Sequence, residues 1–468
     1  METCTFDGTT DNIEKYVTCV TKAATEATVA SIAGDIDNFY LLVCGTLVFL
    51  MQAGFAMLCA GSVRQKNQKN IMLKNLLDAC GGALGFYFLG YGFYMGDGMT
   101  EDKTGFLGTN GFLLIGRDDY ASFFFQFAFA ATAATIVAGT VAERCKMEAY
   151  LCYSLFLTAF VYPVVARAGW NGGFLSGCKD FAGSGIVHMT GGCTALIAAI
   201  VLGPRKGRFT DEDGKDLPEA HTFPPSSVSL QILGTFILWV GWYGFNPGST
   251  LGISGQGALA ARCAVSTTLA AAAGCISSMF LNCLITKNKT GEVVYDLTFA
   301  MNGALGGLVG ITAAPDTTPL WAAIIVGIIA GWVYLGASAL LIKLKIDDAV
   351  DAVPVHFFCG MWGVLAAAIF DEDLGLFMGG GGNQLLQNIY LILFVIAWVG
   401  GLMTPFFIVL NMLGMFRVDS LEEDVGLDIS HHGGAAYNLE APKKEDVDEL
   451  NTRRATAHGK VEKPEMEA

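Results

Sequence analysis

Long apolar runs that lack charged side chains recur along most of the chain. The first extends from Phe39 to Ala60, which is 22 residues, enough for an α-helix to cross a hydrocarbon core of about 30 Å. Further runs follow at residues 72–96, 120–142, 149–166, 185–203, 227–245, 264–285, 297–313, 320–342, 353–370 and 385–413. Since 53% of the residues are hydrophobic and only 15% are charged, the composition excludes a soluble globular protein. The sequence predicts an all-α polytopic membrane protein, with eleven transmembrane helices within residues 38–414 embedded in a lipid bilayer.

Lysine and arginine are concentrated in every second loop, which indicates the orientation of the chain. The loops after the first, third, fifth, seventh and ninth runs hold most of these residues and are expected in the cytosol. Residues 1–37 are then predicted to lie outside the cell, and residues 415–468 to form a cytosolic tail. Outside the cell, Cys4 and Cys19 can pair as a disulfide. The net charge of −15 gives no sign of a nucleic-acid partner.

Two matched segments place a histidine inside an apolar run. Asp180 to His188 reads Asp-Phe-Ala-Gly-Ser-Gly-Ile-Val-His, and Asp348 to His356 reads Asp-Ala-Val-Asp-Ala-Val-Pro-Val-His. Spans one to five and six to ten therefore resemble two copies of one unit. Because five is an odd number, the copies cross the membrane in opposite senses. Such an inverted repeat is typical of transporters, whose substrate path lies at the repeat interface near the midplane, and the eleventh span is an addition outside the repeat.

These two histidines are the strongest candidates for chemistry inside the membrane. Burial disfavours a protonated imidazole, so the rings are expected to be neutral and to offer donor and acceptor nitrogens to a small polar molecule. The simpler interpretation is that each histidine belongs to the core and bonds a neighbour. A zinc site would need a third protein ligand, for which Cys359 is the one candidate near His356, and His188 has no counterpart. We therefore expect neither a metal nor another cofactor.

Aromatic side chains gather where the predicted topology places the outer surface. Phe125 and Phe129 lie on one helix face at the outer start of the third span. Trp170 lies in an outer loop, and Ser249 follows the sixth span. Because aromatic faces attract cations, Phe125, Trp170 and Ser249 predict an external cage with one hydroxyl acceptor, although an interfacial aromatic belt is the alternative. Asp180 is expected to cap its helix and to add negative field.

The composition changes at residue 415, where charged residues replace the apolar runs. The segments 426–430 and 433–437 keep enough apolar residues to dock on the membrane domain, whereas the distal tail is expected to be disordered. The sequence Arg-Arg-Ala-Thr that ends at Thr456 resembles a basophilic kinase site.

Four motifs resemble the ammonium transporter family (Amt/Mep/Rh) in both identity and spacing. They are Gly-Trp-Tyr-Gly-Phe-Asn-Pro-Gly-Ser at 241–249, the Asp-to-His segment at 180–188, Ala-Glu-Arg at 142–144 and Asp-Ala-Val-Pro-Val-His at 351–356. The resemblance runs from about residue 39 to 437. Because Trp170 is present, the chain is more similar to the eukaryotic Amt branch, including plants, than to the Rh branch.

The resemblance implies a homotrimer with a separate pore through each subunit, and a role for each matched residue. It implies that Phe125, Trp170 and Ser249 recruit ammonium outside the cell, with support from Asp180. It also implies a stacked phenyl gate of Phe129 and Phe245, followed by the twin pore histidines His188 and His356. In the tail, it implies regulatory phosphorylation of Ser430 by a kinase.

Together these features predict an integral membrane transporter, expected in the plasma membrane. It would capture ammonium at the cage, remove a proton and conduct ammonia past the histidines, with net ammonium uptake and methylammonium as an analogue. An ammonium sensor that signals through the tail is the alternative, and uptake of labelled methylammonium separates the two. An enzyme is not expected, because no nucleophile and base pair is evident.

Overall fold

The computed structural model describes residues 10–97, 105–437 and 444–457. Within these residues the protein is almost wholly helical, with only two isolated β-bridges, so the all-α fold is confirmed. The α-helices are α1 (Thr10–Ser62), α2 (Gln68–Gly85), α3 (Tyr91–Met95), α4 (Tyr120–Thr140), α5 (Met147–Phe156), α6 (Tyr162–Trp170), α7 (Thr190–Leu202), α8 (Val228–Phe245), α9 (Gly257–Thr290), α10 (Leu297–Ile311), α11 (Leu320–Lys343), α12 (Cys359–Phe370), α13 (Asn383–Met412), α14 (Ser420–Val425), α15 (Leu427–His432) and α16 (Lys444–Ala457). Shorter π-helical segments lie within or at the start of spans: η2 (Phe86–Gly90), η4 (Leu157–Val161), η5 (Ser184–Met189) and η7 (Val353–Phe358).

Ten helical stretches in the described part of the chain are long and apolar enough to cross a bilayer. They coincide with ten of the predicted runs, and the exception is the run at 297–313. There α10 has only 15 residues, or about 22 Å, and it packs against α9, α11 and α12. Gly303 of α10 allows this close packing, since a Cβ at Gly303 would lie 2.6 Å from the carbonyl oxygen of Gly274. A helix enclosed by other helices need not match the bilayer thickness, so the count of eleven spans stays a prediction.

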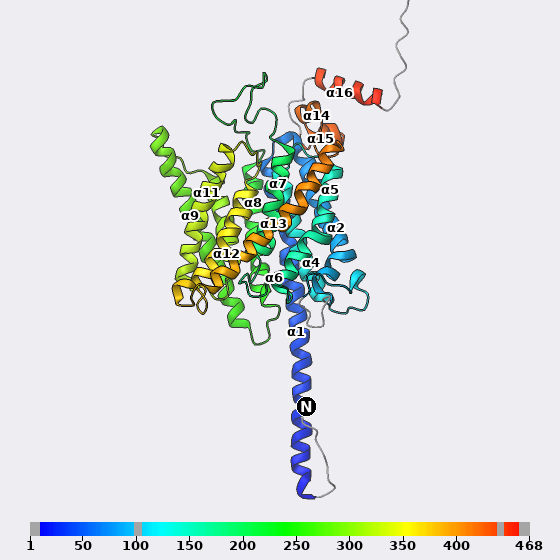
Figure 1. Cartoon of the computed structure of the whole chain (residues 1–468), viewed down its shortest axis with the longest axis vertical. Helices are drawn as coiled ribbons and strands as arrows, with labels where there is room; N and C mark the ends of the chain where they lie inside the picture. Colours follow the sequence, from blue (N-terminus) through cyan, green and yellow to red (C-terminus); the bar gives the residue numbers. More distant parts are fainter. Residues whose placement is uncertain (1–9, 98–104, 438–443, 458–468) are drawn as a thin grey trace, which may run out of the picture.

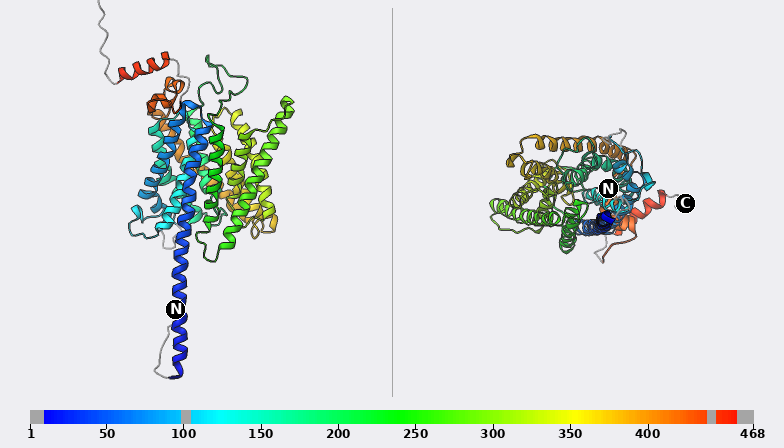
Figure 2. Two further views of the ribbon diagram at one scale, coloured as in Figure 1. Left: turned by 180° about the vertical axis from the view of Figure 1, so that it is seen from behind. Right: turned by 90° about the horizontal axis from the view of Figure 1, so that it is seen from below.

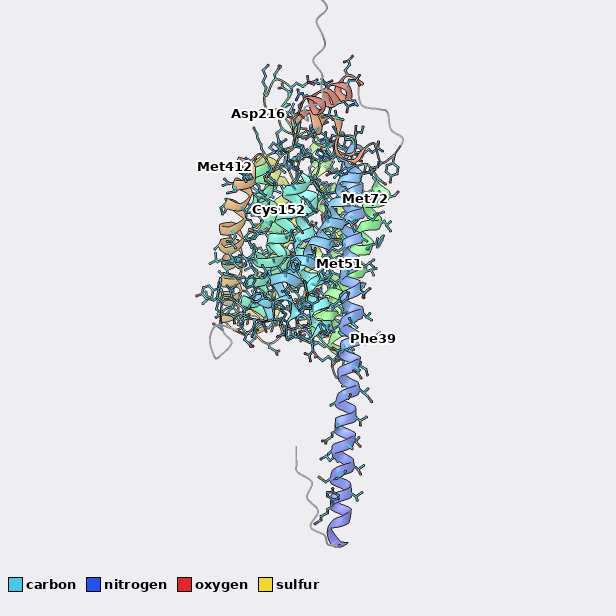
Figure 3. The ribbon with its side chains drawn as sticks, turned by 90° about the vertical axis from the view of Figure 1, so that its right-hand side faces the viewer. Phe39, Met51, Met72, Cys152, Asp216 and Met412 are labelled. Atoms are coloured by element: carbon cyan, nitrogen blue, oxygen red, sulfur yellow. The ribbon has the colours of Figure 1, made fainter. Side chains whose placement is uncertain are left out.

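The first helix begins well before the first predicted span. α1 is continuous for 53 residues and projects from one end of the bundle (Figure 1). Phe39 lies where α1 enters the bundle, and Met51 lies within it (Figure 3). The residues before Phe39 contain no proline, so nothing prevents the helix from continuing into water. Cys19 is disulfide-bonded, whereas Cys4 lies outside the described residues, and the pairing of these two cysteines stays a prediction.

Equivalent helices of the two halves pack against each other. The first spans of the halves, α1 and α8, are neighbours, and the fifth span, η5–α7, packs against its counterpart, η7–α12. α13 contacts both α7 and α12 and runs along the edge of the bundle across both halves (Figure 2). This arrangement agrees with two copies of one unit and an added helix.

The projecting end of α1 and the tail lie at opposite ends of the bundle (Figure 1). The helices α14, α15 and α16 lie at the same end as the loop that contains Asp216 (Figure 1, Figure 3). α16 is a helix in a stretch where the sequence predicted disorder. It packs on α14, because Leu450 is only 5% exposed and Arg453 lies 3.6 Å from the carboxylate of Asp419.

Candidate functional site

The two histidines of the matched segments meet inside the bundle. Nδ1 of His188 lies 3.2 Å from Nδ1 of His356, and the ring centroids are 5.2 Å apart with the planes inclined by 21°. Both side chains are buried. In a neutral pair, one Nδ1 must donate the proton that the other accepts. The two Nε2 atoms then also differ, because one carries a proton and the other is an acceptor.

The turn that carries His188 into the bundle is held by Asp180. The carboxylate accepts hydrogen bonds from the backbone N–H groups of Gly183 (3.2 Å), Gly185 (3.0 Å) and Ile186 (2.8 Å). Gly183 has a φ of +107°, and a Cβ there would lie 3.1 Å from the Trp170 ring, so this position favours glycine. The carboxylate thus satisfies N–H groups that the start of a helix leaves free.

Asp348 does the same for the turn that carries His356. Its carboxylate accepts from the backbone N–H groups of Val350 (3.2 Å) and Val353 (2.7 Å). Both histidines lie in π-helical segments, η5 and η7, and such segments are frequent at functional sites. In both motifs, the eight-residue spacing therefore separates the aspartate that caps the helix from the histidine that it positions.

Aromatic rings from α4 and α8 form a column that ends at His188. The centroids of Phe125 and Phe129 are 4.7 Å apart. Phe129 stacks on Phe245 at 4.0 Å with an angle of 26°, and Phe245 stacks on His188 at 5.4 Å. Trp170, at the end of α6, meets Phe129 edge-on at 6.1 Å. The structure thus brings four of the predicted aromatic residues together next to a predicted histidine.

Ser249 lies in η6 (Pro247–Thr250), the turn that follows α8. Its hydroxyl donates to the carbonyl oxygen of Phe245 at 2.8 Å, which leaves the lone pairs of the hydroxyl oxygen as acceptors. The preceding residue, Gly248, lies against Phe125, because a Cβ at Gly248 would be 3.0 Å from that ring. This turn is therefore next to the start of the aromatic column, and Ser249 is partly exposed.

Trp242, which lies beside His188, was missed by sequence reasoning. Trp242 stacks on His188 with centroids 5.2 Å apart and an angle of 17°, and its indole N–H donates to the Thr312 hydroxyl at 2.9 Å. Trp242 precedes Phe245 by three residues, so both rings lie on one face of α8. That spacing was the signal available in the sequence.

Two adjoining cavities lie on the tail side of the histidines. The first, of about 20 Å³, is lined by His356, Phe55 and Thr135 among others, and it has room for about one water-sized molecule. The second, of about 190 Å³, has a more polar lining that includes Arg205 and Asp351. The aromatic column therefore leads to the histidine pair, and His356 lines the smaller of the two cavities.

The residues around the histidines do not resemble a metal site. Among the described residues, no group of three or more histidine, cysteine, aspartate or glutamate side chains could hold a metal ion. The thiol of Cys359, the candidate for a third ligand, donates to the carbonyl oxygen of Ala330 at 3.4 Å.

The tail docks on the start of α2. The carboxylate of Asp428, which is fully buried, accepts hydrogen bonds from the backbone N–H groups of Lys69 (3.0 Å) and Asn70 (2.9 Å). Ser430, on the docked helix α15, is only 2% exposed, so a kinase can reach it only after α15 has left this position. Thr456 belongs to α16, but its side chain lies outside the part of the chain that the structure describes.

Comparisons with known proteins give one consistent family. Residues 39–437 match the model of the Ammonium Transporter Family. The chain is 43% identical over 421 residues to ammonium transporter 1 member 2 of Oryza sativa subsp. japonica, covering 81% of this chain and 82% of the relative. It is 42% identical to ammonium transporter 1 member 1 of Arabidopsis thaliana, covering 81% of each.

Two solved structures extend this likeness to the fold. A structure described as a sensor Amt protein has a TM-score of 0.77 at 32% identity, covering 86% of this chain and 99% of that one. The structure of Candida albicans Mep2 has a TM-score of 0.73 at 26% identity, covering 87% of this chain and 93% of that one.

Proposed function

Since this chain belongs to the ammonium transporter family, we propose that the aromatic column and the histidine pair form the path by which ammonium is captured, deprotonated and conducted as ammonia. The chain is an integral membrane ammonium transporter and not an enzyme. The observation that carries the proposed path is the 3.2 Å contact between the rings of His188 and His356, directly behind the stacked pair of Phe129 and Phe245.

Ammonium is recruited where the aromatic column begins, by Phe125, Trp170 and Ser249. An aromatic face attracts a cation by about 0.5–2 kcal/mol, and more strongly once water is removed. The Ser249 oxygen accepts one N–H of the ammonium ion. Asp180 supports recruitment through its negative field and holds Trp170 in place, because the indole N–H donates to the Asp180 carbonyl oxygen at 2.6 Å.

The stacked rings of Phe129 and Phe245 then close the path. With centroids 4.0 Å apart they leave no space for a hydrated ion, so a molecule passes only when the rings move and its water is left behind. A small ion loses several kcal/mol in a dry path even after relaxation, and each 1.4 kcal/mol slows passage about tenfold. Transfer of a proton to the outer water removes this cost, because neutral ammonia needs only a hydrogen-bond partner.

The histidine pair provides that partner. Its two Nε2 atoms comprise one donor and one acceptor, and ammonia carries both N–H groups and a lone pair. Nε2 of His188 is buried and has no hydrogen-bond partner among the described residues, so it is available to a passing molecule. Potassium is of similar size to ammonium but cannot lose a proton, and we expect the path to reject it.

The proposed assembly rests on the resemblance to the family, and the proposed orientation rests on the lysine and arginine residues of alternate loops. We propose a homotrimer in the plasma membrane, with the projecting part of α1 outside the cell and the tail in the cytosol. In the polar cavity beyond His356, ammonia takes a proton from the cytosolic water, and uptake is of net ammonium when the proton released outside also crosses the membrane. Phosphorylation of Ser430 or Thr456 would release the docked tail and change the transport rate.

Ammonium sensing is the second candidate function. One similar structure is described as a sensor Amt protein, and here the tail contacts α2, which packs on α4, the helix that carries Phe129 of the gate. A sensor would bind ammonium and rearrange its tail without conducting the substrate.

The test is uptake of labelled methylammonium together with voltage-clamp recording during ammonium steps. We expect uptake by the native protein, and at least a tenfold lower rate in His188→Ala and in His356→Ala. Ammonium-evoked current decides whether the proton follows the ammonia. Saturable ammonium binding without uptake would favour the sensor, and appreciable potassium current through the native protein would contradict the proposed path.

A further inference from the structure

The two cavities beyond the histidine pair share one polar side chain. Three residues line both cavities, namely Leu58, Asn302 and Val350. Two of them are aliphatic, so among the described residues Asn302 has the one polar side chain at the junction. A molecule that leaves His356 through the smaller cavity therefore meets the amide of Asn302 before it reaches the polar cavity.

The orientation of the Asn302 amide is determined by a chain of hydrogen bonds. Nδ2 of Asn302 donates to the Tyr334 hydroxyl at 3.1 Å, and this hydroxyl donates to the Asp351 carboxylate at 2.9 Å. Because Tyr334 has only one hydroxyl proton, its oxygen can only accept from Asn302. A reversed amide would bring two acceptor oxygens together, so the carbonyl oxygen Oδ1 must point away from Tyr334.

The same chain of bonds ties the amide to the histidine segment. Asp351 stands at the start of that segment, and its carbonyl oxygen accepts from the backbone N–H of Val355 at 3.1 Å, next to His356. Asn302 and Tyr334 are both buried. In a low-dielectric setting, successive hydrogen bonds polarise one another, and here each donor in the series points toward the Asp351 carboxylate. The bond that Asn302 donates into this series makes its carbonyl oxygen a better acceptor. The link through Tyr334 and Asp351 also fixes the position of that oxygen relative to His356.

We propose that Asn302 is an inner docking point for ammonia, whose N–H group donates to the Asn302 carbonyl oxygen as the molecule passes from His356 to the polar cavity. Tyr334 is a positioning residue that sets the orientation of the amide. This inference rests on the proposed ammonia path and adds to it a residue that acts after the histidine pair. No covalent bond is broken or made at Asn302, and ammonia takes a proton from the cytosolic water only in the polar cavity beyond it.

The test compares Asn302→Leu with Tyr334→Phe. Leucine has a similar volume but no acceptor, and phenylalanine leaves the amide free to rotate. Ser278→Ala is the matched control, because Ser278 packs against Gly303, next to Asn302 on α10, and lines neither cavity. Each variant is first checked for surface expression and for native oligomeric size.

We expect the maximal rate of methylammonium uptake to fall about five- to tenfold in Asn302→Leu, as expected for one lost hydrogen bond in the path. In Tyr334→Phe we expect a fall of about two- to fivefold. The external concentration for half-maximal uptake should change less than twofold in both, because the recruitment residues are untouched, and Ser278→Ala should match the native protein.

A native maximal rate in Asn302→Leu would overturn the inference, as would an equal loss in Ser278→Ala. If Asn302→Leu does not fold, Tyr334→Phe decides, and a native rate in that variant overturns the inference, because ammonia is proposed to dock at an amide that Tyr334 orients. Failure of the proposed function itself is seen separately, as absence of uptake by the native protein.

Discussion

Asparagine in place of Asp180 should loosen the turn that carries His188. The two side chains are nearly equal in size, but asparagine has no charge and only one acceptor oxygen. In the native protein, one carboxylate oxygen accepts from Gly185 and Ile186 and the other from Gly183. An asparagine oxygen can keep the first two bonds, but its NH₂ group then faces the N–H of Gly183.

The magnitude follows from these three bonds. A hydrogen bond to a charged acceptor contributes about 1.5–3 kcal/mol, and one to a neutral acceptor about 0.5–1.5 kcal/mol. Weakening of two bonds by about 1 kcal/mol each and loss of the third, at about 2 kcal/mol, add up to about 4 kcal/mol. Asp348 holds two N–H groups on separate oxygens, so Asp348→Asn should weaken one bond and lose the other, which costs about 3 kcal/mol. The chain thus supplies its own matched comparison.

Thermal unfolding of the purified protein and labelled methylammonium uptake measure the two consequences. We expect the lowest unfolding midpoint in Asp180→Asn, an intermediate one in Asp348→Asn, and at least tenfold lower uptake in Asp180→Asn because His188 is displaced. Asp180→Glu, which keeps the charge, should retain more uptake than Asp180→Asn. A native midpoint together with native uptake in Asp180→Asn would refute the capping argument.

Three further predictions follow from other parts of the structure. Trp242→Phe keeps a ring against the histidine but loses the indole donor and leaves a cavity at a fully buried position. The free energy of unfolding should therefore fall by about 2–3 kcal/mol, and uptake should fall by less than tenfold. A larger loss of uptake at unchanged stability would mean that the indole itself acts in transport. Ser430→Glu places a charge in a buried position, so limited proteolysis should cut the tail faster than in Ser430→Ala, and uptake should fall; equal cleavage rates would contradict the docking role of this position. Burial by itself would raise the pKa of Asp347, but Arg144 and Arg205 outweigh this effect and hold that pKa below the usual range. The ionised carboxylate therefore contributes its full share of the free energy of unfolding above about pH 4. This contribution is lost as the pH falls further. Asp347→Asn should be about 3–5 kcal/mol less stable at neutral pH, and this difference should narrow toward pH 3 in thermal unfolding; a difference that does not depend on pH would show that the carboxylate does not act through its charge.

The sequence by itself determined the membrane class and ten of the spans. A helix that crosses lipid must satisfy its own backbone and present apolar side chains along its whole length, and both are local properties of the chain. The prediction was weakest where this rule does not apply. α10 is enclosed by protein and is shorter than a bilayer is thick. Nothing in the apolar pattern marks the start of α1, which begins outside the bundle and runs into it (Figure 1).

The two aspartate and histidine pairs were also accessible from the sequence, because each aspartate caps the turn that carries the histidine eight residues later. Only the tertiary structure decided how these residues meet. His188 and His356 are 168 positions apart in the chain, and the contact of their Nδ1 atoms, the stacking of Trp242 on His188 and the place of Asn302 between two cavities all join different helices. Such contacts depend on how helices pack around one another, which the periodicity of a single helix does not encode.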